Sequence, residues 1–310
     1  MSHTAFIFPG QGSQYAGMGK DLAGTFTVAR DAFAEADDAL GFHLSRLCFE
    51  GPEEHLKLTA NTQPAILATS VAALRVARAE TGRVASYVAG HSLGEYSALV
   101  AAGALSFADA LRTVRARGTF MQEAVPVGIG AMAAILGVEP EALAEICAEA
   151  SQGEVVSPAN FNSPGQIVIA GHAGAVNRAI EIAKGRGFRK AMLLPVSAPF
   201  HCSLMTPAGE RLAQVLDGVM TSPLQLPVVT NVEALPNSDA GRVKELLIRQ
   251  VSAPVRWDAS VRWMVDNGVT SFVEIGPGKV LSGLVKRIFK DIPSCNVEDT
   301  AGVKSLEGGA

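Results

Sequence analysis

One serine stands between two glycines where a predicted strand gives way to a predicted helix. Gly90-His91-Ser92-Leu93-Gly94 matches the pattern G-x-S-x-G, between a strand expected at 84–89 and a helix expected at 95–102. Glycines at both outer positions permit a turn that is too sharp for a side chain, and this turn lifts the serine clear of the sheet. The next helix directs free N–H groups at the same place, where they favour a developing negative oxygen. The pattern predicts that Ser92 is a nucleophile that forms an ester, and the alternative is a chance match in a glycine-rich turn.

A serine nucleophile needs a base, and among six histidines His201 is the candidate. It follows the predicted strand 190–194 in a loop that Pro195 and Pro199 stiffen, at the predicted start of a helix. His91 adjoins the serine, but consecutive side chains in a tight turn point apart. A purely structural role for His201 is the alternative. No carboxylate is marked as the partner of the imidazole, so a backbone carbonyl is a second possibility beside the acidic residues that follow in the chain: Asp217, Asp239, Asp258 and Glu274.

One arginine falls on the apolar side of a predicted helix. Ser106 is placed to cap this helix, which is expected to end at about Glu123. At about 100° per residue, Arg117 lies at the edge of the apolar arc, whereas Arg112 and Arg115 point toward solvent. A guanidinium in this place can bind a substrate carboxylate with two hydrogen bonds. The alternative is that the stem is buried and the charged head reaches water.

The elements around these residues predict an α/β fold in two parts. Short apolar strands alternate with helices over most of the chain, which predicts a mostly parallel sheet with helices on both faces. Between 127 and 195 the order changes to βαββαβ, the ferredoxin-like unit. We therefore expect a large catalytic domain formed by 1–126 and 196–310, and a small inserted domain at 127–195. The last helix is expected at about 279–290, with a loose tail after Val297.

Composition excludes several classes of protein. The 310 residues are 48% hydrophobic and 18% charged, which indicates a globular chain, and a net charge of −4 argues against a nucleic-acid binder. The four cysteines share no CxxC or CxH spacing, so neither a metal site nor a disulfide framework is expected. No secretion signal precedes the first strand, and the longest stretch without charged residues is broken by Asn, Ser, Pro and Gly. We expect a soluble, cytoplasmic protein that binds neither nucleic acid nor membrane.

Several motifs in order along the chain, from about 4 to 290, resemble the malonyl-CoA:acyl carrier protein transacylases. These motifs are FPGQGSQ at 8–14, QPA at 63–65, GHSLGEY at 90–96, RARG at 115–118, NFNSPGQ at 160–166, APFH at 198–201, TNV at 230–232 and EIGPG at 274–278. The resemblance implies a hydrolase-like core with a ferredoxin-like insertion, in agreement with the predicted order of elements.

The resemblance also implies how the serine is activated. Ser92 would be the acylated nucleophile and His201 its base. The main-chain carbonyl of Gln250 would hold the imidazole in place of a carboxylate.

Substrate recognition follows from the same resemblance. Arg117 would bind the free carboxylate of a malonyl group, and the backbone N–H groups of Gln11 and Leu93 would form the oxyanion hole. Phe200, before the histidine, is similar to malonyl-selective relatives and gives mild support for a pocket with little room for an α-methyl group.

The implied activity is transfer of a malonyl group from malonyl-CoA to the phosphopantetheine thiol of an acyl carrier protein, for fatty acid or polyketide biosynthesis. It would follow a ping-pong course with no metal or redox cofactor, and we expect a monomer. Carrier proteins are acidic, so a basic rim would assist docking. Its two candidate sites, which ordinary solvated surface would also explain, are Lys286, Arg287 and Lys290, or Lys184, Arg186, Arg189 and Lys190.

Two other functions remain open. A serine thioesterase or other hydrolase would use the same serine and histidine, with water as the acceptor. In such enzymes the histidine usually lies near the C-terminus, whereas 109 residues follow His201 here. A carrier-docking scaffold without activity is the other alternative, although no motif is broken.

Overall fold

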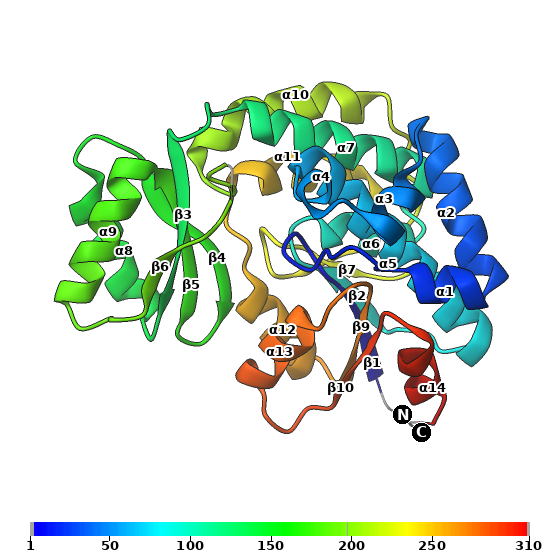
Figure 1. The fold of residues 1–310 in the computed structure, drawn as a ribbon. Helices are drawn as coiled ribbons and strands as arrows, with labels where there is room; N and C mark the ends of the chain where they lie inside the picture. Colours follow the sequence, from blue (N-terminus) through cyan, green and yellow to red (C-terminus); the bar gives the residue numbers. More distant parts are fainter. Residues whose placement is uncertain (1–2, 197, 309–310) are drawn as a thin grey trace.

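The computed structural model describes residues 3–196 and 198–308 (Figure 1). Ser197, in the loop before His201, lies outside the described residues, as do the first two residues and the last two of the predicted tail. The fold is a mixed α/β arrangement with two separate sheets.

The larger sheet positions Ser92, which follows its strand β2. It has six strands in the order β10-β9-β1-β2-β7-β8, and neighbours run parallel except for β7 and β8. The strands are β1 (His3–Phe8), β2 (Tyr87–Gly90), β7 (Val228–Val229), β8 (Pro236–Asn237), β9 (Val269–Ile275) and β10 (Ser294–Val297). The strand predicted at 84–89 begins later because Val84 is 82% exposed and cannot belong to a buried strand.

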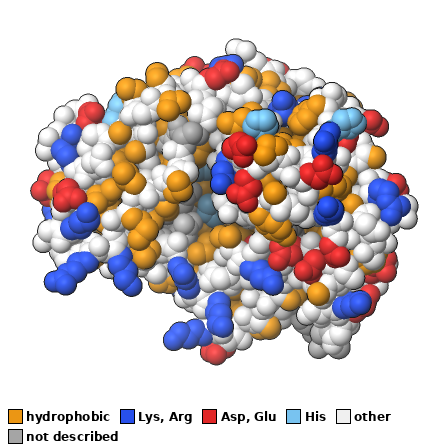
Figure 2. All heavy atoms as spheres, in the orientation of Figure 1, with side chains coloured by type: hydrophobic (Ala, Val, Ile, Leu, Met, Phe, Trp, Pro, Cys, Tyr) orange, Lys and Arg blue, Asp and Glu red, His pale blue; other side chains and the backbone are white. Residues whose placement is uncertain are grey.

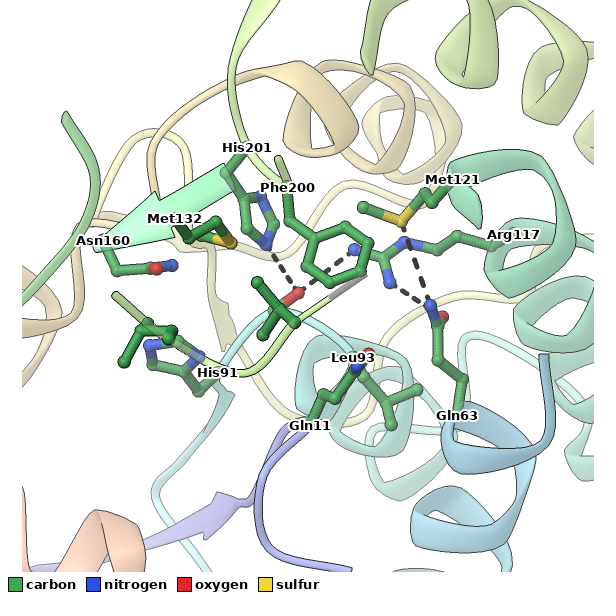
Figure 3. A pocket seen from close by; sticks show the side chains of 13 residues that line it. Gln11, Gln63, His91, Leu93, Arg117, Met121, Met132, Asn160, Phe200 and His201 are labelled. Carbon is green, nitrogen blue, oxygen red and sulfur yellow. Dashed lines mark hydrogen bonds between the residues drawn. The ribbon is translucent and has the colours of Figure 1, made fainter. Parts of the chain in front are cut away.

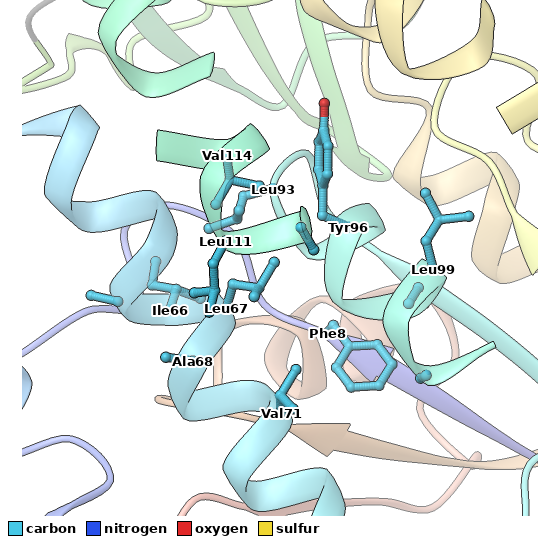
Figure 4. Packing of buried hydrophobic residues seen from close by; sticks show 14 of the residues in the cluster. Phe8, Ile66, Leu67, Ala68, Val71, Leu93, Tyr96, Leu99, Leu111 and Val114 are labelled. Carbon is cyan, nitrogen blue, oxygen red and sulfur yellow. The ribbon is translucent and has the colours of Figure 1, made fainter. Parts of the chain in front are cut away.

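Both faces of the larger sheet are covered by helices, as predicted. Phe6 and Phe8 of β1 pack with α5 (Thr59–Thr81), α6 (Gly94–Ala101) and α7 (Phe107–Glu123) in the core seen in Figure 4. The alternate residues Ala5 and Ile7 pack on the other face with α12 (Trp257–Asp266) and α13 (Val280–Ile288). Since both faces are buried, the central stretches 5–8 of β1 and 88–90 of β2 contain no polar side chains, instead of alternating apolar and polar residues.

The smaller sheet has the predicted βαββαβ order. Its strands β3 (Gly130–Leu136), β4 (Val156–Ser163), β5 (Gln166–His172) and β6 (Ala191–Leu193) are antiparallel in the order β4-β5-β3-β6. Helices α8 (Pro140–Ser151) and α9 (Ala173–Gly185) cover one face, against Ile135 and Ile169. Met132 and Ala170 on the other face join the main core. The division into two domains at 127 and 195 stays a prediction.

The remaining helices surround the larger sheet. They are α1 (Lys20–Thr25), α2 (Thr27–Leu40), α3 (Leu44–Glu50), α4 (Glu53–Leu56), η1 (Ser203–Met205), α10 (Thr206–Asp217), η2 (Ala240–Arg242), α11 (Val243–Ser252) and α14 (Thr300–Gly308). Among the described residues, none of the helices combines the length and apolar character needed to span a membrane.

The expectation of a loose tail after Val297 is wrong. That residue ends β10, which pairs with β9, and α14 follows. Val303 and Leu306 of α14 are 2% and 3% exposed and belong to the main core. Two apolar residues three apart are too few to establish a helical period, so the sequence pattern could not reveal this short helix.

Candidate active site

The turn between β2 and α6 is closed so tightly that its glycines cannot be replaced without a shift. A Cβ atom on Gly90 would lie 1.9 Å from the carbonyl of Gly94, and one on Gly94 would lie 2.0 Å from the carbonyl oxygen of Phe8. Ser92 between them has a φ of 51°, in the left-handed region of backbone conformation that residues other than glycine rarely adopt. The turn therefore has the geometry predicted from the sequence motif, with the serine at its apex.

Ser92 and His201 lie within hydrogen-bond distance across 109 residues of sequence. The serine Oγ is 2.7 Å from Nε2 of the imidazole (Figure 3). On the other side of the ring, Nδ1 is 2.9 Å from the main-chain oxygen of Gln250. Because a carbonyl only accepts, Nδ1 carries the proton and Nε2 is free to accept from the serine hydroxyl. The arrangement is a serine and a base, with a carbonyl in the place of the usual carboxylate.

None of the four acidic candidates for the third position contacts the imidazole. Each has another place in the structure. Asp217 is exposed at the end of α10, Asp239 caps η2, Asp258 pairs with Arg262, and Glu274 accepts from the first amides of α13.

Burial keeps the imidazole neutral. His201 is 4% exposed, and its desolvation, together with the nearby charge of Arg117, lowers its pKa to about 3. The ring can therefore accept a proton at neutral pH.

Arg117 is buried beside the nucleophile and does not reach water. The residue is 2% exposed, and its Nη2 donates to the serine Oγ at 3.2 Å. The side-chain oxygens of Gln63 and Gln250 accept from Nη1 at 2.8 Å and from Nη2 at 2.9 Å. Nε has no acceptor among the described residues. The alternative in which the charged head reaches solvent is thus excluded, and no carboxylate of the described residues contacts the guanidinium directly.

Gln11 and Leu93 come together because β1 and β2 are parallel neighbours. Phe8 pairs with Gly90, so the residues three positions after each strand end meet above the sheet. Both residues line the cavity in front of the serine, and neither amide has a backbone acceptor among the described residues. Gly10 permits this approach, since a Cβ there would lie 2.3 Å from the carbonyl oxygen of His91. Two free amides beside a serine can bind an oxyanion.

The cavity in front of Ser92 is small, about 120 Å³, and is shared by both sheets. Its polar lining comes from Gln11, Gln63, His91, Ser92, Arg117, Asn160 and His201. Its apolar lining comes from Leu93, Met121, Met132, Leu194, Val196 and Phe200. In Figure 3 dashed lines join the serine oxygen to the base on one side and to the guanidinium on the other, with the Phe200 ring close by.

Four residues of the site had no predicted side-chain role: Gln63, Glu95, Asn231 and Gln250. Asn231 accepts from the Ser92 N–H at 2.6 Å and donates to the carbonyl of Gly90 at 2.6 Å, so it braces the turn. Glu95 lies behind the turn and is 2% exposed. The available signal was their place inside motifs, since the first three belong to segments that match the family pattern.

No group of three or more metal-ligating side chains exists among the described residues.

Comparisons with known proteins agree over the whole chain. Residues 5–305 match the family model described as Acyl transferase domain. The chain is 51% identical to the malonyl CoA-acyl carrier protein transacylase of Escherichia coli, over 99% of this chain and 100% of that protein. It is 52% identical to the Bacillus subtilis protein of the same name, over 96% and 94%. A solved malonyl-transacylase, in complex with its type II PKS acyl-carrier protein, matches with a TM-score of 0.97, 48% identity and 100% coverage of both chains.

Proposed function

Because the chain belongs to the acyltransferase family of malonyl CoA-acyl carrier protein transacylases, we propose that it transfers malonyl groups from malonyl-CoA to the phosphopantetheine thiol of an acyl carrier protein through an ester on Ser92. The observation that carries the proposal is the buried guanidinium of Arg117, whose Nη2 lies 3.2 Å from the serine Oγ. A cation so close to the nucleophile suits a short acyl group with a carboxylate at its far end. The apolar walls and the small volume leave little room for more.

In the first half-reaction the serine becomes acylated. His201 Nε2 takes the hydroxyl proton as Oγ attacks the thioester carbon, and the negative oxygen binds to the amides of Gln11 and Leu93. The C–S bond then breaks, and the imidazolium returns its proton to the CoA sulfur. Loss of one oxyanion donor typically lowers the rate by about 10²–10³-fold. The carbonyl of Gln250, 2.9 Å from Nδ1, stabilises the charged imidazole that forms in between.

In the second half-reaction the carrier thiol replaces CoA. Its proton passes to His201, its sulfur attacks the ester carbon, and Ser92 leaves with that proton. Arg117 holds the malonyl carboxylate through both halves, so the same carbonyl stays at the same two amides. No redox change occurs in either step.

The carrier would approach along a row of basic side chains. Figure 2 shows Lys and Arg side chains along the lower left of the molecule, over the small sheet and α13. In the small-sheet candidate, Lys184 and Arg186 are already paired with glutamates, which leaves Arg189 and Lys190. In the other candidate, none of Lys286, Arg287 and Lys290 has an ion pair among the described residues. We place the docking surface at α13 for this reason.

The hydrolase alternative differs only in the acceptor, and the comparisons do not favour it. The test is to mix the protein with malonyl-CoA and follow free malonate and malonyl carrier separately. We expect slow release of malonate without carrier, and transfer at least a hundredfold faster once phosphopantetheine-bearing carrier is added. Steady malonate release that carrier does not accelerate would identify a hydrolase.

A further inference from the structure

A buried carboxylate lies directly behind the nucleophile, and the mechanism above does not use it. Glu95 is the second residue of α6 and is 2% exposed. Its Oε2 accepts from the main-chain N–H of Asn231 at 3.1 Å and from Nε2 of Gln250 at 2.8 Å. Both donors are neutral amides, so the carboxylate has no direct cationic partner in the described part of the chain. A buried carboxylate in this condition is costly unless a charge nearby offsets it.

The side chain of Gln250 joins this carboxylate to Arg117. Its Nε2 donates to Glu95 and to the carbonyl of Ser92 at 2.9 Å, and its Oε1 accepts from the guanidinium at 2.9 Å. The two ends of the amide cannot be exchanged, because the guanidinium only donates and the carboxylate accepts. Glu95 and Arg117 therefore form an ion pair separated by one amide, and that amide belongs to the residue that also holds the base.

The nearby charge that affects the pKa of Glu95 is that of Arg117. Burial raises the pKa of Glu95 to about 7, while the bonds from Gln250 and Asn231 and the charge of Arg117 lower it in part. At neutral pH the carboxylate is thus close to the balance between its two protonation states.

The other titratable groups on the elements around α6 do not contribute charge there. On the nearest elements, burial lowers the pKa of His91 and His201 and raises that of Tyr96, so all three are neutral at pH 7. Arg78 of α5 binds the carbonyl of Ala101 at the opposite end of α6. His3 and Tyr87 begin β1 and β2, whereas Glu95 follows the strand ends.

We propose that Glu95 is the resident counter-charge of Arg117, and that it takes up a proton from water when the carboxylate of a malonyl group reaches the guanidinium. One O–H bond forms on the carboxyl group and nothing is oxidised or reduced. Before acylation the ionised form of Glu95 balances the guanidinium through the amide of Gln250, and after acylation the substrate carboxylate takes its place. Glu95 touches neither the acyl group nor the reacting atoms, so it is a positioning residue. The inference rests on the proposed function, since it needs a malonyl group in the pocket.

The first test measures protons in the unaltered protein. Ser92 is acylated with malonyl-CoA or with acetyl-CoA in weakly buffered solution at pH 7 with a pH indicator. Since the pKa of the free enzyme's carboxyl group is about 7, we expect malonylation to take up to about half a proton per ester more than acetylation. Equal proton uptake for the two donors would overturn the proposal.

The second test uses Glu95→Gln and compares the two donors as a function of pH. In the unaltered protein the ratio of kcat/KM for malonyl-CoA to that for acetyl-CoA should fall roughly fivefold from pH 6 to pH 8, because ionised Glu95 opposes the second carboxylate. Titration of the CoA phosphates and of the base affects both donors equally, so it does not change this ratio of kcat/KM values. In Glu95→Gln it should not change with pH, and an unchanged fivefold fall would contradict the proposal.

Glu274→Gln is the matched control. Glu274 is also fully buried, and burial also raises its pKa, but it accepts from amides of Leu281 and Ser282 at the start of α13. This variant should keep the pH-dependent ratio. If Glu95→Gln does not fold, the proton measurement decides alone. If no ester forms on Ser92, the proposed function fails, whereas an ester with equal proton uptake rejects only the role of Glu95.

Discussion

At the scale of single residues, the Ser92 hydroxyl is placed between a base and a cation. It donates to His201 over 2.7 Å and accepts from Arg117 over 3.2 Å. Both Ser92 and His201 have positive φ, at 51° and 60°, so the backbone is strained at both residues of this hydrogen bond. The guanidinium of Arg117 donates to the serine oxygen and the imidazole of His201 can accept its proton, and both contacts favour a developing alkoxide.

Arg117→Ala should separate recognition of the carboxylate from the chemistry of the ester. We expect kcat/KM for malonyl-CoA to fall by about 10²–10⁴-fold, since removal of one partner of a buried hydrogen-bonded charge pair costs roughly 3–5 kcal/mol. Transfer from acetyl-CoA should be retained or improved. Initial rates with each donor measure this.

Arg115→Ala is the control on the same helix. Arg115 contacts Asn61 and the Phe42 ring away from the cavity, so this variant should keep the preference for malonyl-CoA. Equal losses for both donors in Arg117→Ala would mean that the arginine is structural.

The pH profile should show an unusually weak base. Since burial and Arg117 lower the pKa of His201 to about 3, the imidazole remains neutral, and active, as the pH falls through the ordinary histidine range. We expect kcat/KM for malonyl-CoA not to decrease between pH 7 and pH 5, with folding checked by circular dichroism. A tenfold decrease per pH unit that starts near 6.5 would show an ordinary histidine.

At the scale of elements, the turn from β2 to α6 sets the positions of the serine and of one oxyanion donor. Gly94→Ala would put a Cβ 2.0 Å from the Phe8 carbonyl oxygen. We expect a loss of about 2–3 kcal/mol in the free energy of unfolding and a much slower acylation, because the Leu93 amide must move. Gly283→Ala, in an exposed turn of α13 with open space around it, should instead stabilise by about 0.5–1 kcal/mol. Urea unfolding measures the stability of both variants. Similar changes in the free energy of unfolding for Gly94→Ala and Gly283→Ala would contradict a turn closed this tightly.

The C-terminal helix should contribute to stability. Leu306→Ala removes a side chain that is 3% exposed in the main core, and we expect it to lower the free energy of unfolding by about 2 kcal/mol. Lys304→Ala on the exposed side of α14 should change it by less than about 0.5 kcal/mol. If both variants unfold at the same urea concentration as the unaltered protein, α14 does not pack as described.

Elements were predictable where the sequence carries a period or a breaker. The helix α7 was predicted because its apolar residues recur at helical spacing, and its start was predicted because Ser106 precedes them and serine is a preferred capping residue. The residue-level site was predictable in part, since the serine motif and the histidine stand out by type and context. The amide network was not, because its partners are distant in sequence: Arg117 and Gln250 are 133 residues apart, and only the fold brings them together.

At the scale of the whole molecule, the cavity depends on both sheets. Met132 of β3 lines it from the small sheet, and Gln11 and Ser92 line it from the turns that follow β1 and β2 of the larger sheet. The small sheet is tied to the other part by β4, since Phe161 donates to the Val255 carbonyl at 2.8 Å and Val255 donates to Ala159 at 2.9 Å. Val255 follows soon after Gln250, so one segment contacts both the His201 imidazole and the small sheet. The fold class was predictable from the order of elements, but this connection was not.

The most direct test of the central claim is the identity of the group on Ser92. The protein is mixed with equal amounts of malonyl-CoA and acetyl-CoA, quenched before any acceptor is added, and analysed by intact mass and peptide mapping. We predict one malonyl group, on the peptide that contains Ser92, in large excess over acetyl, and no adduct in Ser92→Ala. Equal acetyl and malonyl labelling, or a malonyl group that survives in Ser92→Ala, would contradict an ester on this serine selected by Arg117.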